Sequence, residues 1–250
     1  MSIFTARTLF LKQSLDEGHP TAEIFEFKES SVDIETISEG SIAVEIQVIS
    51  ADPYLRGQIK STGSIKAGTP MFGFVGGKVI ASKNEAWVVG DLFGSRLPFS
   101  TYQILTPEIL ASTVTWKLTD LISESEISLS IGVLGMPGAT AYGGVVDVLR
   151  PNAGETIFIS AAAGAVGSLA GQIAKEIYNC KVIGSCGGPE KSELVKSQFK
   201  FDAAIDYKTT HTTAELVAAI KQFAPEGIDM YFENVGGIHF DAAMATLRLV

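Results

Sequence analysis

The second half of the chain alternates short apolar runs with amphipathic segments. The apolar runs at 156–160, 181–185, 203–206 and 229–233 have the length of buried strands, and segments between them, such as 213–223, have the length of helices. Strands that alternate with helices are typical of a parallel, doubly wound sheet. The pattern therefore predicts an α/β domain whose four visible strands follow the order 3-2-1-4.

The first half of the chain consists mostly of strand-like segments and turns. Residues 42–48 alternate in part, as a half-buried strand does, and 71–81 is an apolar strand broken by glycines, which is typical of bulges and barrel corners. The segment 87–95 places Gly-Asp in a turn between two strands. This half is predicted to form a small, irregular β barrel.

The two patterns meet at Ser-Glu-Ser-Glu, residues 123–126. Serine and acidic residues are favoured in the first turn of a helix because they satisfy its free N–H groups and its positive dipole end. We therefore predict a helix start here and divide the chain into domains 1–123 and 124–250.

A turn of small residues, Ser-Ala-Ala-Ala-Gly-Ala-Val-Gly at 160–167, joins the first predicted strand of the second domain to a helix. Strand, tight turn and helix are the parts of a dinucleotide-binding unit, although Ala162 replaces the first glycine of Gly-x-Gly-x-x-Gly. Gly164 lets the backbone approach a pyrophosphate, and Gly167 lets the helix pack close to the strand. The helix N-terminus favours the phosphates. A helix of small residues packed on a sheet is the alternative.

The end of the second strand indicates which cofactor the domain binds. NAD sites usually carry an acidic residue there for the ribose 2′-hydroxyl, but residues 184–188 contain none. Lys191 can supply a cation to a 2′-phosphate, and Ser185 a hydroxyl. NADP(H) is therefore favoured. A solvated lysine at a helix start is the alternative interpretation of Lys191.

Two further residues follow later strands, at the sheet edge where ligands bind in such folds. Asn234 opens the sequence Asn-Val-Gly-Gly at 234–237 and can bond the ribose or the nicotinamide side, unless the segment is a plain turn. Tyr207 follows the third strand, where it lies either beside the adenosine or in the core.

Four motifs together resemble a known family. They are Asp-Pro-Tyr-Leu-Arg-Gly at 52–57, Gly-Met-Pro-Gly-Ala-Thr-Ala-Tyr at 135–142, the small-residue turn at 161–168 and Asn-Val-Gly-Gly at 234–237. In this order they resemble the zinc-independent medium-chain dehydrogenase/reductases. The branch they resemble most is the prostaglandin reductases, also called leukotriene B4 12-hydroxydehydrogenases or NADP-dependent alkenal double-bond reductases. The resemblance covers essentially the whole chain and implies a GroES-like catalytic domain followed by a Rossmann domain.

The resemblance also implies site residues. The cofactor residues are Met136 and Thr140 near the nicotinamide, Gly164, Ala165, Val166 and Gly167 at the pyrophosphate, Lys191 at the 2′-phosphate, Tyr207 and Asn234. Tyr54 and Arg56 fall in the segment that lines the substrate cleft in the family. For these two, a buried tyrosine and an ion-paired arginine are equally good interpretations.

The implied activity is the NADPH-dependent reduction of the C=C bond of α,β-unsaturated aldehydes or ketones, of the alkenal or 15-oxoprostaglandin type. A hydride passes to the β carbon, hydrogen-bond donors stabilise the enolate, and the α carbon takes a proton. The alternatives are a quinone reductase of the same superfamily and a catalytically weak, nucleotide-binding truncated paralogue.

The chain departs from the family in two places. Residues 97–102 are an atypical version of a Trp-containing strand, and the chain ends at Val250, inside the helix predicted after residue 237. Family members continue with further strands, a pocket tyrosine and a segment that returns to the catalytic domain. We therefore expect a fragment or a shortened form, whose fourth strand is an exposed edge open to pairing with another chain.

Composition narrows the partners. The chain carries 28 acidic and 19 basic residues, a net charge of −9, which argues against nucleic acid and anionic membranes as partners. A small enone or enal and a possible homodimer are the expected partners. His19 is the only histidine before residue 200 and Cys180 and Cys186 are the only cysteines, so no metal site is predicted. With neither a signal peptide nor a bilayer span in the pattern, a reducing cytoplasmic setting is expected.

Overall fold

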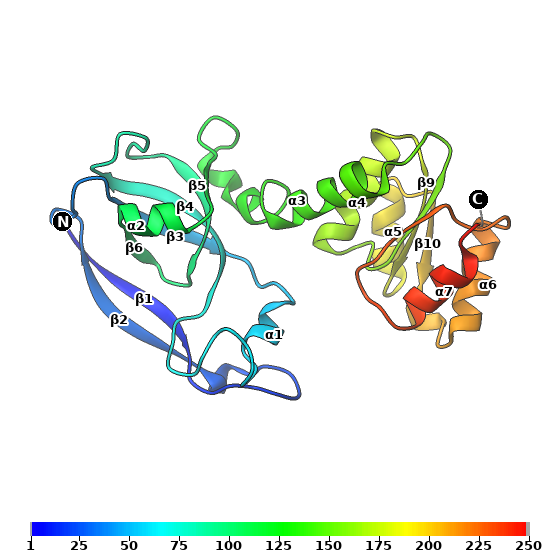
Figure 1. Ribbon diagram of the computed structural model, residues 1–250, viewed down its shortest axis with the longest axis horizontal. Helices are drawn as coiled ribbons and strands as arrows, with labels where there is room; N and C mark the ends of the chain where they lie inside the picture. Colours follow the sequence, from blue (N-terminus) through cyan, green and yellow to red (C-terminus); the bar gives the residue numbers. More distant parts are fainter. Residues whose placement is uncertain (1, 249–250) are drawn as a thin grey trace. The chain divides into compact units, whose positions relative to one another are not determined.

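The computed structural model describes residues 2–248, and the chain divides into two units, Met1–Gly135 and Met136–Val250. An antiparallel sheet of five strands, in the order β6-β3-β4-β5-β7, forms the centre of the first unit (Figure 1). Its strands are β3 (Ile42–Ile49), β4 (Phe72–Ser82), β5 (Leu92–Pro98), β6 (Tyr102–Leu105) and β7 (Thr115–Lys117). The short helices of this unit are η1 (Ala22–Ile24), α1 (Leu55–Gln58), α2 (Pro107–Ser112) and η2 (Glu124–Ile131).

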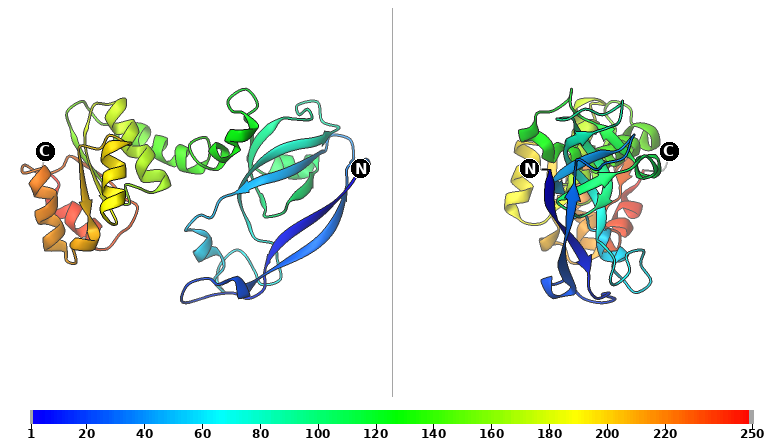
Figure 2. Two further views of the ribbon diagram at one scale, coloured as in Figure 1. Left: turned by 180° about the vertical axis from the view of Figure 1, so that it is seen from behind. Right: turned by 90° about the vertical axis from the view of Figure 1, so that its left-hand side faces the viewer.

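Strands β1 (Ile3–Leu11) and β2 (Phe25–Asp33) form a separate antiparallel ribbon, which is long and two-stranded in both views of Figure 2. The ribbon meets the sheet through single bridges at Thr8–Ser100 and Phe10–Pro70. The predicted barrel is therefore closed by isolated bridges and not by a continuous ladder. Buried side chains from both parts, including Leu11 and Phe93, share one core.

The glycines of β4 explain the irregularity that the sequence predicts. The pairing of β3 with β4 shifts register between Ile46 and Val48, opposite Gly76 and Gly77. A Cβ at Gly77 would stand 2.1 Å from the carbonyl oxygen of Glu45. Only a residue without a side chain allows the strands to approach this closely at the bulge.

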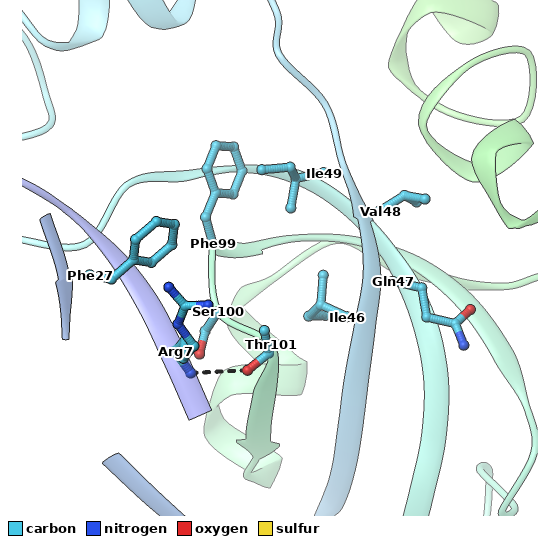
Figure 3. A pocket seen from close by; sticks show the side chains of 9 residues that line it. All are labelled: Arg7, Phe27, Ile46, Gln47, Val48, Ile49, Phe99, Ser100 and Thr101. Atoms are coloured by element: carbon cyan, nitrogen blue, oxygen red, sulfur yellow. Dashed lines mark hydrogen bonds between the residues drawn. The ribbon is translucent and has the colours of Figure 1, made fainter. Parts of the chain in front are cut away.

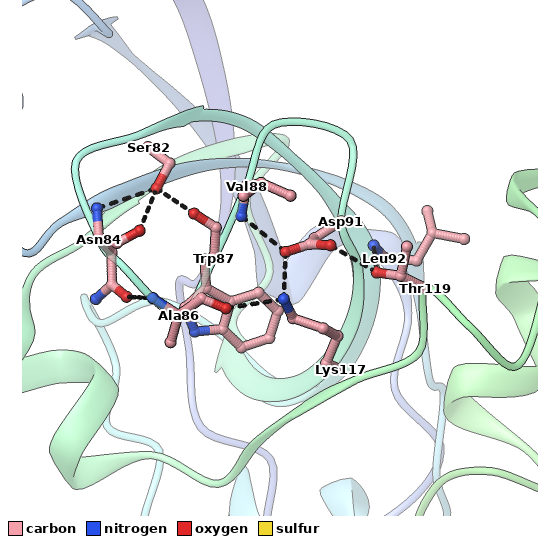
Figure 4. A network of polar contacts seen from close by, with 9 residues as sticks. All are labelled: Ser82, Asn84, Ala86, Trp87, Val88, Asp91, Leu92, Lys117 and Thr119. Carbon is pink, nitrogen blue, oxygen red and sulfur yellow. Dashed lines mark hydrogen bonds and ion pairs between the residues drawn. The ribbon is translucent and has the colours of Figure 1, made fainter.

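The turn between β4 and β5 is held by a polar network, which Figure 4 shows. Asp91 is buried; its carboxylate accepts bonds from Val88 N (2.8 Å) and Thr119 Oγ1 (2.9 Å) and pairs with Lys117 (2.6 Å). Burial raises the pKa of Asp91, but these partners more than offset that effect and keep the pKa below its usual value. Residues 87–89 belong to this turn and not to a strand, and the predicted Gly-Asp turn leads directly into β5.

The first unit extends beyond the boundary expected after residue 123, because η2 packs on it. Ile127 is buried in a cluster with Leu92 and Leu118. A capping box between Ser123 and Glu126 starts this helix at the position that the sequence predicts.

The described part of the second unit, residues 136–248, contains four parallel strands in the order β10-β9-β8-β11, which confirms the predicted 3-2-1-4 order. They are β8 (Thr156–Ile159), β9 (Lys181–Cys186), β10 (Ala203–Asp206) and β11 (Met230–Phe232). The helices are α3 (Met136–Tyr142), its π-helical continuation η3 (Gly143–Leu149), α4 (Ala165–Glu176), α5 (Pro189–Ser197), η4 (Tyr207–Thr209), α6 (Thr213–Phe223) and α7 (Ile238–Thr246).

Helices cover both faces of this sheet (Figure 1). Ile157 and Ile159 of β8 pack with residues of α3, α4 and α5, while Phe158 between them packs with residues of α6 and α7. Alternate residues of a strand point to opposite faces, so a continuous apolar run serves two cores. The doubly wound α/β arrangement predicted from the sequence is confirmed.

The end of the described chain differs from the sequence expectation. Helix α7 ends at Thr246, and Leu247 is extended and forms a bridge with Ile228. Arg248 pairs with Asp229. The segment 247–248 is therefore not helical; it bridges to Ile228, just before β11, and β11 itself is the last strand in the sheet order, as the sequence predicts. Within residues 2–248 no single helix has the length and apolar character needed to cross a bilayer.

Candidate cofactor and substrate sites

The small-residue turn after β8 leads into the N-terminus of α4, as predicted. Gly164 is the extended N-cap residue of α4, and the first N–H groups of the helix, from Ala165 to Gly167, have no acceptor within it. A Cβ on Gly167 would stand 2.4 Å from the carbonyl oxygen of Ala161. The sequence interpretation of Gly167 was therefore incomplete, because its closest contact is the turn itself and not the strand.

Ala161 has a left-handed backbone, with φ +48°. This conformation is strained for any residue with a Cβ. It lets Ala161 O accept the N–H of Gly164 (2.8 Å) while Ala162 N donates to Ser185 O of β9 (2.9 Å). The turn is therefore defined by its backbone, and it leaves the N-terminus of α4 open to an anion.

Asn234 closes the other side of this turn. Its backbone N–H donates to Ser160 Oγ (2.8 Å), and its Nδ2 donates to Ser160 O (2.8 Å). Glu233 Oε1 accepts the N–H groups of Val235 and Gly236 and the hydroxyl of Ser160 (3.2 Å). These bonds fasten the ends of β8 and β11 together and hold Asn234, which is exposed, at the edge of the sheet.

Tyr231 of β11 is the remaining member of this hydrogen-bond network. Its hydroxyl donates to Ser160 Oγ (3.1 Å), and its ring stacks on Phe158 with centroids 5.4 Å apart. Burial raises the pKa of Tyr231, so the hydroxyl stays protonated. Burial also raises the pKa of Glu233, but the bonds from the two backbone N–H groups more than offset that effect. The pKa is therefore below its usual value, and the carboxylate is ionised. Sequence reasoning missed these residues; the only signal was an acid immediately before Asn-Val-Gly-Gly.

The tip of β9 brings together three of the predicted cofactor residues. Ser185 is fully buried, and its hydroxyl bonds Nε2 of His239 (2.9 Å). Lys191 is exposed in the first turn of α5. Tyr207 follows β10 and places its hydroxyl beside Gly187, where a Cβ would lie 2.8 Å from it. The hydroxyl of Ser185 therefore faces the protein interior, while Lys191 and Tyr207 flank the loop that follows β9.

A second cation lies beside the same loop. Lys208 Nζ is 3.9 Å from the position that a Cβ on Gly188 would take. Asp206 Oδ1 accepts the N–H groups of Gly188 (2.8 Å) and Lys208 (3.0 Å), which ties the loop to the end of β10. The sequence signal for Lys208 was its place directly after Tyr207. That position indicates a cofactor contact only once β10 is known to pair with β9, because the pairing brings Lys208 beside the loop after β9.

Met136 and Thr140 lie on α3, which packs beside α4 in the same unit. Thr140 Oγ1 donates to Met136 O (2.8 Å) and lies 3.4 Å from its sulfur atom. The structure thus places both residues on a neighbour of the helix whose N-terminus is open to an anion.

Tyr54 and Arg56 belong to the first unit. Arg56 donates to the carbonyl oxygens of Leu15 (2.7 Å) and Gly18 (3.0 Å), so it bonds backbone oxygens where the sequence allowed an ion pair. The hydroxyl of Tyr54 is buried and makes no hydrogen bond of full geometry within residues 2–248; burial raises its pKa, and the nearby guanidinium of Arg96 lowers it in part. Its ring packs edge-on against Phe74, with centroids 6.5 Å apart.

Two hollows lie side by side in the first unit. The larger has a volume of about 380 Å³ and a mostly apolar wall that includes Arg56 and Phe25. The smaller, of about 150 Å³, is shown in Figure 3; it shares Ile49 and Phe99 with the larger one. Arg7 stands at its rim and stacks over the ring of Phe27, 4.7 Å from the centroid. Tyr54 does not line either hollow.

No group of three or more His, Cys, Asp or Glu side chains in the described residues is arranged to hold a metal ion. Burial raises the pKa of both thiols, Cys180 and Cys186, which are free.

Two protein families match parts of this chain. Residues 7–112 match the family described as N-terminal domain of oxidoreductase, and residues 165–249 match the family described as zinc-binding dehydrogenase.

Named proteins match nearly the whole chain. The chain is 38% identical to 2-alkenal reductase (NADP(+)-dependent) of Nicotiana tabacum over 239 residues, which is 93% of this chain and 66% of that protein. It is 38% identical to prostaglandin reductase 1 of Bos taurus over 231 residues, 92% of this chain and 66% of that protein. The chain therefore spans about two thirds of the length of these relatives.

Two crystal structures of CurA from Vibrio vulnificus share the fold. One of them is a complex with NADPH, and both match with a TM-score of 0.82 and 33% sequence identity. The matches cover 97% and 96% of this chain, respectively, and 68% of CurA.

Proposed function

Because this chain belongs to the medium-chain dehydrogenase/reductase superfamily, we propose that it is an NADPH-dependent oxidoreductase that reduces the C=C bond of α,β-unsaturated aldehydes or ketones. The observation that carries the proposal is the cradle formed by the turn at 160–167 and the segment at 234–237. Relatives named for NADP-dependent alkenal reduction and prostaglandin reduction support the substrate class.

The residues of the second unit fit NADPH. Ala165, Val166 and Gly167 offer N–H groups that have no acceptor within α4 to a pyrophosphate, and Gly164, whose own N–H donates to Ala161 O, allows its close approach to this helix N-terminus. Asn234 donates its Nδ2 to Ser160 O, which leaves its amide oxygen without a partner among residues 2–248 and available to the ribose or nicotinamide side. We assign Met136 and Thr140, on α3, to the nicotinamide end.

The adenosine end suits a 2′-phosphate. The end of β9 carries no carboxylate, the Tyr207 hydroxyl and Lys208 Nζ lie beside the loop that follows it, and the exposed Lys191 stands in the first turn of α5 after that loop. A 2′-phosphate here would gain charge-assisted bonds from the lysines, and the carboxylate of Asp206 at the end of β10 is engaged by the N–H groups of Gly188 and Lys208. The hydroxyl of Ser185 contributes indirectly in this proposal, because it is already bonded to His239.

NADPH supplies the hydride when it is bound. The chain then has to hold an apolar enal or enone, exclude water and stabilise the negative charge on the carbonyl oxygen. The apolar hollow of about 380 Å³ supports binding of the carbon chain. We propose Tyr54 as a substrate-side residue because its neighbours Pro53 and Leu55 line this hollow, although its own buried hydroxyl does not. Arg56 acts by fixing the loop at 15–18.

Two further proposals concern the setting of the protein. Both cysteines are buried free thiols, which supports a reducing, cytoplasmic environment. We propose a homodimer, which sedimentation or light scattering of the purified chain tests directly.

The test of function is turnover with a panel of acceptors. The purified chain is mixed with NADPH and a 2-alkenal, a 15-oxoprostaglandin or a simple quinone, and nicotinamide absorbance is followed. Consumption of NADPH with the enal, together with formation of the saturated aldehyde, supports the proposal. Turnover of the quinone alone would instead indicate a quinone reductase, and NADPH binding without turnover a binding protein.

A further inference from the structure

His239 connects three elements at the adenosine end of the candidate site. It lies on the first turn of α7 and is only 5% exposed. Its Nε2 is 2.9 Å from the hydroxyl of Ser185 at the tip of β9. Its ring meets the ring of Tyr207, which follows β10, edge to face with centroids 5.8 Å apart.

Both partners of His239 contact other parts of the candidate cofactor site. The carbonyl oxygen of Ser185 accepts the N–H of Ala162 in the phosphate turn (2.9 Å). The hydroxyl of Tyr207 lies beside Gly187, in the loop between β9 and Lys191. A shift of the imidazole would therefore reach the end of β9 through one contact and the 2′-phosphate side through the other.

An apolar side chain would fill this position without the cost of burying an imidazole. A buried polar ring is tolerated when it is hydrogen-bonded, and here the bond to Ser185 satisfies Nε2. Burial also lowers the pKa of His239, so the ring is neutral and can exchange a hydrogen bond with the serine hydroxyl.

We propose that His239 is a positioning residue that sets Tyr207 and the tip of β9 for recognition of the 2′-phosphate. It does not touch the cofactor; it fixes the two groups that face the adenosine ribose. The inference rests on the proposed NADPH function. It adds a role in cofactor specificity that depends on β10, on α7 and on the buried bond between Ser185 and His239.

The experiment measures Kd for NADPH and NADH with the full chain, by titration of nicotinamide fluorescence. His239→Leu removes both the bond and the ring. His239→Gln keeps an amide at a similar reach and should restore the bond to Ser185, and Ser185→Ala removes the bond from the other side. Thr246→Val is the matched control, because Thr246 is a buried polar residue of the same helix whose side chain, among the described residues, bonds only Ala242 O and Ala243 O.

We expect His239→Leu to raise the Kd for NADPH by about 3- to 10-fold, the range for one buried hydrogen bond, and the Kd for NADH by less than about 2-fold. His239→Gln should recover part of the loss. Ser185→Ala combined with His239→Leu should be little worse than His239→Leu alone. Thr246→Val should lower thermal stability and leave the ratio of the two Kd values unchanged.

The outcomes separate the two proposals. If the wild-type chain binds neither nucleotide, the proposed function fails and the role of His239 fails with it. If the wild type prefers NADPH and His239→Leu changes both Kd values equally, or neither, only the positioning role is overturned. Thermal unfolding of each variant shows whether a change of Kd comes from a chain that is already partly unfolded.

Discussion

The cradle of the second unit and the hollows of the first unit are built in different ways. In the cradle, the groups offered to a ligand are backbone N–H groups and residues within a few positions of strand ends, such as Asn234. In the first unit, a side chain from one segment bonds the backbone of a distant one, as when Arg56 donates to the carbonyl oxygens of Leu15 and Gly18. A backbone-built site depends on where side chains are absent, whereas a side-chain-built site depends on which loops come together.

The largest effect is expected where the cradle needs a missing side chain. Gly167→Ala places a Cβ 2.4 Å from the carbonyl oxygen of Ala161, which is backbone and cannot rotate away. We expect a loss of about 2–4 kcal/mol in the free energy of unfolding, together with loss of NADPH binding. Gly143→Ala is the control, since the nearest atom to its Cβ is 3.9 Å away. Urea unfolding of both variants checks this; equal stabilities would contradict the close approach.

The next effect belongs to the first unit and should leave the cradle unchanged. Asp91→Ala removes a buried carboxylate that serves Val88, Thr119 and Lys117, and should cost about 2–3 kcal/mol in stability. The Kd for NADPH should stay the same. A shift in that Kd would show that NADPH binding by the second unit depends on the stability of the first unit.

The same carboxylate predicts a pH dependence. The pKa of Asp91 in the folded chain is below its unfolded value of about 3.9. Its contribution is therefore complete above about pH 5 and is lost as the pH falls through the folded pKa. Unfolding followed between pH 7 and pH 3 should show a smaller loss of stability for Asp91→Asn than for the wild type.

The contrast between the units also explains what the sequence could predict. Helix α6 begins at Thr213 and ends at Phe223, as the pattern of apolar positions and the following Pro225 indicate. Local periodicity, caps and small-residue turns are contained in short stretches of chain. The bond between Ser185 and His239 spans 54 positions, and no local pattern indicates it. The partners of Arg56 likewise depend on how a loop folds back, so the sequence left its role open.

A smaller effect tests the side chains that surround the backbone cradle. Lys191→Ala should raise the Kd for NADPH by an amount equivalent to about 1–3 kcal/mol and leave the Kd for NADH unchanged, because only NADPH carries the 2′-phosphate. Lys208→Ala should act in the same direction, since its ammonium lies beside the same loop. Titration of both variants with both nucleotides checks this. Equal affinities of the wild type for NADPH and NADH would sink the assignment of this end.

The smallest effect probes strain in the cradle itself. Ala161 has φ +48°, a conformation that costs a residue with a Cβ about 1–2 kcal/mol, while glycine adopts it freely. Glycine also loses more chain entropy on folding, about 0.5–1 kcal/mol, so Ala161→Gly should raise stability by a net amount of about 1 kcal/mol or less.

Two variants isolate the cause of that gain. Lys200 has a similar left-handed backbone conformation, with φ +60°, and lies outside the cradle. Lys200→Gly should therefore raise the free energy of unfolding by a similar amount. Ala163→Gly has no positive φ to relieve and should lose stability. Urea unfolding of the three variants, with NADPH titration of each, completes the comparison. If Ala161→Gly destabilises the chain while Lys200→Gly stabilises it, then the methyl group of Ala161 contributes packing to the turn, and the cradle is not defined by its backbone alone.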